Sequence, residues 1–89
     1  MRTIYKYELS ELNTTLYKIN MPKGAEILTM QLQKKIPCLW AIVETEIELE
    51  ERRFEIIGTG QEFLHICKKY IGTFQVSDGD FIFHVFEQI

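Results

Sequence analysis

Hydrophobic and polar positions alternate along much of the chain, which is typical of β-strands with one buried face. In the segment 25–33, Leu28, Met30 and Leu32 alternate with polar residues, so a half-buried strand is predicted there. Other strands are expected where β-branched and aromatic residues cluster between short polar breaks. These predicted strands cover residues 3–9, 14–19, 38–43, 52–57, 71–76 and 81–87. The first two are expected to form a hairpin across residues 10–13.

Two of the predicted strands have no clear polar face. Residues 38–43 are apolar at every position, and residues 81–87 carry aromatic side chains on both faces. A strand of this kind needs cover on both sides. The core of the domain would cover one side of residues 38–43, and a partner subunit is a candidate for the other.

Turns and one helix complete the predicted fold. The run 21–24 (MPKG) favours a turn, and Asp78-Gly79 between the last two strands favours a hairpin because glycine accepts positive φ. Residues 61–70 have apolar side chains at helical spacing and are predicted to form one short helix. The pattern therefore predicts a mainly β fold, a small antiparallel sheet of about six or seven strands with at most one short helix.

Length and composition narrow the class of protein. With 89 residues, the chain is expected to be a single domain covering 1–89, small enough to gain stability from forming a homo-oligomer. The net charge of −3 argues against generic DNA binding. No run approaches the ~18 apolar residues of a membrane span. Cys38 and Cys67 stand among apolar neighbours, as reduced core thiols do, so a cytoplasmic location is expected.

Catalytic and metal-binding patterns are missing from the sequence. We find no candidate nucleophile beside a base and no metal-ligand spacing, so no catalytic residue, metal or cofactor is predicted, and the protein is not expected to be an enzyme. The two histidines, His65 and His84, each lack a second ligand pair at zinc-site spacing. A structural or surface role is favoured for both.

Two features suggest a ligand-binding site. Arg52 and Arg53 present planar forks of donors suited to phosphate, and the Gly-Thr-Gly segment 58–60 could offer backbone NH groups to an anion. The same segment could equally mark an ordinary corner of the chain. Aromatic side chains could stack on a base or simply fill the core. The predicted ligand-binding residues are Arg52, Arg53, Gly58, Thr59, Gly60, Trp40, Tyr70 and His84.

A family resemblance extends over nearly the whole chain. It rests on seven ordered segments: IYKYEL (4–9), MPKGAEIL (21–28), PCLWAIV (37–43), ERRF (51–54), GTG (58–60), YIGTFQ (70–75) and FHVFE (83–87). In these segments the chain resembles a family of short phage-encoded proteins of unknown function. The resemblance implies a phage gene acting in the host bacterial cytoplasm. Small β-rich phage proteins include anti-defence nucleotide sponges, which sequester cyclic nucleotide immune signals, and size, origin and composition suggest that class.

Three functional hypotheses follow from these observations. In the first, a homo-oligomer captures a small nucleotide at its subunit boundary, with Arg52 and Arg53 on the phosphates and Tyr70 or Trp40 on a base. A buried arginine–glutamate pairing within the run 50–53 (EERR) would argue against it. In the second, the chain inhibits a host protein through an exposed strand edge or the acidic segment 44–51. The third, a nucleotide hydrolase, needs a general base or metal that the sequence does not supply.

Overall fold

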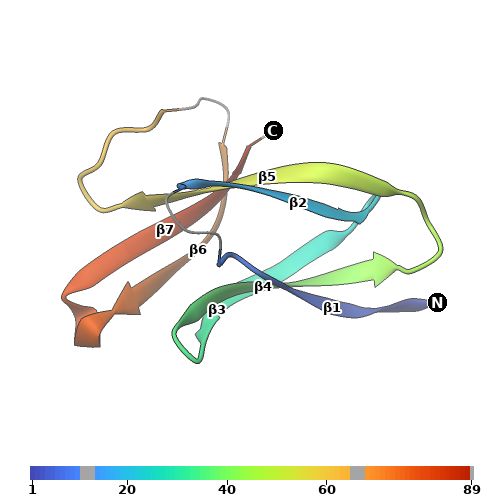
Figure 1. The fold of residues 1–89 in the computed structure, drawn as a ribbon, viewed down its shortest axis with the longest axis horizontal. Helices are drawn as coiled ribbons and strands as arrows, with labels where there is room; N and C mark the ends of the chain where they lie inside the picture. Colours follow the sequence, from blue (N-terminus) through green and yellow to red (C-terminus); the bar gives the residue numbers. More distant parts are fainter. Residues whose placement is uncertain (11–13, 65–67, 89) are drawn as a thin grey trace.

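The computed structural model describes residues 1–10, 14–64 and 68–88, which form seven strands in two antiparallel sheets (Figure 1). The strands are β1 (Arg2–Glu8), β2 (Leu16–Pro22), β3 (Glu26–Gln33), β4 (Ile36–Glu44), β5 (Leu49–Gly58), β6 (Lys68–Val76) and β7 (Phe81–Gln88). The predicted mainly β fold and the number of strands are confirmed, but the strands form two antiparallel sheets where one small sheet was predicted. No α-helix occurs in the described ranges, and none of their helical turns is long enough to span a bilayer.

The two sheets have the strand orders β1-β4-β3 and β2-β5-β7-β6. The predicted hairpin between the first two strands is wrong, because β1 pairs with β4 and β2 pairs with β5. The backbone NH of Leu9 still donates to Pro37 of the first sheet (2.8 Å), whereas Thr15 already accepts from Ile56 of the second (2.9 Å). The chain therefore changes sheet between Leu9 and Thr15, and both early strands find partners far along the sequence.

The core lies between the inner faces of the two sheets (Figure 1). Leu39, Ala41 and Val43 of β4 face Phe54 of β5 and Val85 of β7 across it, and all five are essentially inaccessible to solvent. This packing confirms that residues 38–43 form a central strand. Burial of such large apolar side chains supplies most of the stability of a small domain.

The two sheets approach each other along one side, where β3 and β6 lie next to each other. At this point the register of β6 shifts between Tyr70 and Gly72. A Cβ atom on Gly72 would lie only 2.8 Å from Cγ of Met30 in β3. Glycine is therefore needed here so that the Met30 side chain can enter the core.

The outer face of β4 is partly covered by the chain itself. Lys6 of β1 donates from Nζ to Oε1 of Gln33 in β3 (2.8 Å). Because β1 and β3 flank β4, this hydrogen bond crosses over β4, and Cys38 below it is fully buried. At Cys38 the chain itself therefore covers both sides of β4, without a partner subunit.

The helix predicted for residues 61–70 is wrong at the residues that the structure describes. Residues 61–64 follow the turn after β5 without helical structure, and 68–70 begin β6; residues 65–67 lie outside the described residues. Phe63 and Leu64 are exposed, so the helical spacing of apolar residues does not mark a core-facing stripe here. The hairpin of β6 and β7 is confirmed, with Gly79 at φ 92° in its turn.

Candidate functional site

The outer face of the four-stranded sheet, which we call the outer sheet face, carries several of the predicted site residues. In the register of β6 and β7, Tyr70 lies opposite Phe86 and Thr73 lies opposite His84. Val85, between Phe86 and His84 in sequence, is completely buried in the core. Alternation along β7 therefore turns His84 and Phe86 outward. Thr59 reaches the same face from the turn that follows β5.

A chain of hydrogen bonds joins the polar side chains of this face. Tyr70 Oη lies 2.7 Å from Thr73 Oγ1, which lies 3.0 Å from His84 Nδ1. On the other side of the imidazole, His84 Nε2 lies 2.8 Å from Thr59 Oγ1. The Thr59 hydroxyl in turn donates to the carbonyl of Ile82 (3.3 Å). Both ring nitrogens of His84 are thus engaged.

With a neutral imidazole, one arrangement of protons satisfies all four contacts. The Thr59 hydroxyl donates to the Ile82 carbonyl, so its oxygen must accept from Nε2–H of His84. Nδ1 then accepts from the Thr73 hydroxyl, and the Thr73 oxygen accepts from the Tyr70 hydroxyl. The chain of donors runs in one direction and fixes the orientation of both rings.

An aromatic cluster adjoins this hydrogen-bond chain. Phe86 contacts Tyr70 with ring centroids 5.5 Å apart and Phe63 with centroids 5.1 Å apart, both in edge-to-face arrangements. Such pairs are favourable beyond the area they bury. Tyr70 is 56% exposed and belongs to both the cluster and the hydrogen-bond chain. A planar apolar surface and fixed polar groups therefore lie side by side.

The Gly-Thr-Gly segment contributes the Thr59 hydroxyl to this site. The backbone NH of Gly58 donates to Gln61 Oε1 (2.8 Å), and that of Thr59 donates to the Ile82 carbonyl (3.1 Å). Both groups are thus occupied within the chain, as expected for a turn rather than for an anion cradle. Gly60 has φ 88°, a conformation that favours glycine. A hollow of about 220 Å³ opens beside this turn, reaching Asp80 at the start of the last strand.

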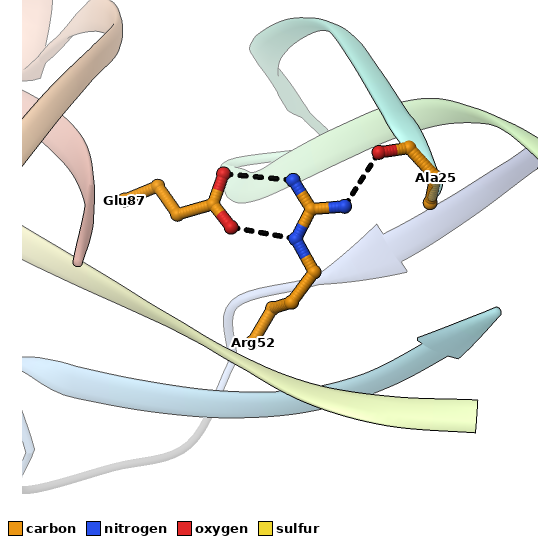
Figure 2. Close-up of polar contacts among 3 residues, drawn as sticks. All are labelled: Ala25, Arg52 and Glu87. Carbon is orange, nitrogen blue, oxygen red and sulfur yellow. Dashed lines mark hydrogen bonds and ion pairs between the residues drawn. The ribbon is translucent and has the colours of Figure 1, made fainter. Parts of the chain in front are cut away.

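Arg52 lies on the opposite, inner face and is committed to an ion pair (Figure 2). Its Nε lies 2.6 Å from Glu87 Oε2 and its Nη2 lies 2.8 Å from Glu87 Oε1, while Nη1 donates to the carbonyl of Ala25. The two side chains are only 16% and 11% exposed. These bonds raise the pKa of the Arg52 guanidinium. The buried partner is Glu87 and not a glutamate of the run 50–53, and this pairing argues against a phosphate-binding role for Arg52.

Arg53 and Trp40 lie on two different surfaces. Arg53 projects from the outer sheet face, pairs with Glu51 (3.0 Å) and keeps a side chain that is 49% exposed. Its cross-strand neighbours are Lys18 of β2 and Gln88 of β7. Trp40 is half-buried on the outer face of the other sheet. The structure therefore places Arg53 on the same sheet face as Tyr70 and His84, and Trp40 on the other sheet.

Thr73 is the main site residue that the sequence does not indicate. Residues three apart in a regular strand point to opposite faces, so Tyr70 and Thr73 would be separated. The register shift between Tyr70 and Gly72 places them on the same face. The glycine at position 72 is the available signal for this irregularity, since glycine inside a strand often marks a bulge.

Among the described residues, no group of three or more His, Cys, Asp or Glu side chains could hold a metal ion.

A family model described as a domain of unknown function, DUF7352, matches residues 1–89. Neither a curated protein nor a solved structure matches the chain.

Proposed function

Because the chain belongs to the DUF7352 family, whose function is unknown, we propose a function from the site itself: the protein binds a small nucleotide and does not alter it. The observation that carries this proposal is the exposed aromatic cluster next to the hydrogen-bond chain through His84. Small-ligand sites commonly combine an apolar surface with a few fixed polar groups. The outer sheet face has both.

A nucleobase suits the aromatic part of the site. Stacking of a base on an exposed aromatic ring contributes roughly 1–3 kcal/mol. The hydroxyl of Tyr70 is held by Thr73, so this ring loses less freedom when a ligand binds. We expect the base to contact Tyr70 and Phe86.

The phosphate groups require positive charge on the same face. Arg53 and its cross-strand neighbour Lys18 are both exposed there. Arginine can bind phosphate oxygens through two parallel N–H groups. We therefore assign the phosphate contact to Arg53 and exclude Arg52, whose donors already bind Glu87 and Ala25.

Binding without turnover is favoured by the hydrogen bonds that both ring nitrogens of His84 make. A general base needs a free acceptor nitrogen close to the proton that it removes. Thr59 and Thr73 occupy both nitrogens of His84 in the described structure. The narrower form of the proposal is that the ligand is a cyclic nucleotide signal of an infected bacterium, removed from its receptor by mass action.

The test is a thermal-shift screen followed by recovery of the ligand. Purified protein is heated with cyclic dinucleotides, cyclic trinucleotides and ADP-ribose derivatives, and each ligand is analysed by mass spectrometry after denaturation. We expect a raised melting temperature with one class of ligand, recovered intact. Tyr70→Ala should abolish the shift. Tyr5→Ala is the matched control, because Tyr5 is an exposed tyrosine (42%) on the other sheet. No shift across the panel would refute binding, and a changed ligand would refute binding without turnover.

A further inference from the structure

The strand β1 has a free edge. It stands at the end of the three-stranded sheet, and β4 is its hydrogen-bonded neighbour in the described part of the chain (Figure 1). Leu9 donates its NH to Pro37 (2.8 Å), and the carbonyl of Met1 accepts from Thr45 (2.9 Å), so odd-numbered residues of this segment bond toward β4. In an antiparallel pair, successive residues bond to opposite sides. The backbone groups of the even-numbered residues therefore point away from β4.

These even-numbered residues carry a specific charge pattern. They are Arg2, Ile4, Lys6 and Glu8, and all four are exposed. An unpaired edge is a template for another strand, and charged side chains on it oppose indiscriminate pairing. Which partner the edge accepts is then decided by how the charges match.

We propose that β1 pairs with β1 of a second copy of this chain, antiparallel and with Tyr5 on the two-fold axis. The two three-stranded sheets would become one sheet of six strands. Arg2 would face the partner's Glu8, and this contact occurs twice because a two-fold interface is self-complementary. Opposite charges directly across a strand pair are stabilising, and like charges are destabilising.

Charge and the length of the pairing together select this register. The free backbone groups belong to even-numbered residues, and an axis through any residue of β1 pairs even-numbered residues with each other, so the neighbouring axes pass through Thr3, Ile4, Lys6 and Tyr7. An axis at Ile4 places Arg2 opposite the partner's Lys6, and an axis at Lys6 places two lysines opposite each other. An axis at Thr3 or Tyr7 also avoids like charges, but it pairs three residues of β1 with the partner's β1, whereas the axis at Tyr5 pairs all seven.

Apolar contacts agree with the axis at Tyr5. The exposed Tyr5 ring packs edge-to-face on Tyr7 (centroids 6.4 Å apart) and would meet its own copy at the axis. The exposed Ile4 would lie against the aliphatic stem of the partner's Lys6. This dimer leaves the outer sheet face free, so it does not depend on the proposed ligand site.

Charge reversal tests the pairing by analytical ultracentrifugation. Glu8→Arg puts like charges opposite each other twice and should weaken dimerisation roughly tenfold. The double variant R2E/E8R restores opposite charges and should restore the dimer. Glu26→Arg, an exposed reversal on β3, is the matched control and should leave the dimer unchanged. A monomeric wild-type protein, or a dimer indifferent to Glu8→Arg, would overturn the proposal.

Cysteine cross-linking tests the register directly, in a Cys67→Ser background. Tyr5 on the axis is a non-hydrogen-bonded pair, whose Cα atoms lie about 4.5 Å apart, within disulfide range. Mild oxidation should link the Tyr5→Cys variant into a covalent dimer. Ile4→Cys and Lys6→Cys report the axes at those two residues and should stay largely unlinked. Preferential linkage of either of them, or no linkage at position 5, would contradict this arrangement.

Discussion

The buried pair of Arg52 and Glu87 should contribute strongly to folding, and replacement of Arg52 by methionine tests this. Methionine is apolar and has a similar length, but it leaves the Glu87 carboxylate, which is 11% exposed, without its partner. Breaking a buried ion pair by removing one partner costs about 3–5 kcal/mol. A small domain has roughly 5–15 kcal/mol of stability in total. Arg52→Met should therefore lose a large share of the stability of the domain.

Urea unfolding followed by circular dichroism measures this loss. Arg53→Met is the matched control, because Arg53 is on the same strand but pairs with Glu51 at the surface. Exposed pairs contribute about 0–1 kcal/mol. The double variant R52M/E87M removes the unpaired carboxylate and should recover most of the stability. Equal losses for Arg52→Met and Arg53→Met, or a double variant no more stable than Arg52→Met, would show that an unpaired buried carboxylate is not the cause of the loss.

The pH dependence of this contribution follows from the pKa of Arg52. Its hydrogen bonds to Glu87 raise the guanidinium pKa above its ordinary value. A raised pKa means that the stabilisation is complete below the pKa of the unfolded chain and is lost only as the pH rises through the higher folded-state pKa. The difference between wild type and Arg52→Met should therefore stay constant in alkaline titration until the chain unfolds.

Three further predictions concern the glycines and the buried thiol. Gly72→Ala should lower the free energy of unfolding in urea by about 1–3 kcal/mol, because the new Cβ would lie 2.8 Å from Met30 Cγ. The loss should be smaller in a Met30→Ala background, and equal losses in both backgrounds would contradict this cause. Gly60→Ala has open space but φ 88°, so about 1–2 kcal/mol of backbone strain is expected in the same assay. Burial raises the pKa of the Cys38 thiol, so stability should fall as the pH rises above its ordinary value of 9.0. The fall in stability should be smaller in Cys38→Ala. Burial also raises the pKa of Tyr7 above its ordinary value of 10.0, so Tyr7 adds to the fall in stability above that pH.

The strands were predictable because their signal is local. Alternation at Leu28, Met30 and Leu32 and the turn at Gly79 each depend on a few neighbouring residues. The pairing of strands was harder to predict, because it depends on which distant apolar faces meet. The run 10–13 resembles a hairpin turn in sequence, but Leu9 before it bonds to one sheet and Thr15 after it bonds to the other.

The candidate site was predictable only in part, for reasons of strand geometry. Arg52 and Arg53 are adjacent in a strand, so they must point to opposite faces, and a single ligand cannot take both. Only the structure shows that the inward one meets Glu87, 35 residues away. Tyr70 and His84 were identified as candidates, but their connection through Thr73 depends on the bulge at Gly72.

The most direct test of the ligand site is an NMR titration of ¹⁵N-labelled protein with the nucleotide that stabilises it most in the thermal screen. The largest amide shifts should fall on the outer sheet face, at Thr59, Tyr70, Thr73 and His84, and Tyr70→Ala should remove them. Shifts centred instead around Trp40 on the three-stranded sheet would show that the outer sheet face is not the binding surface.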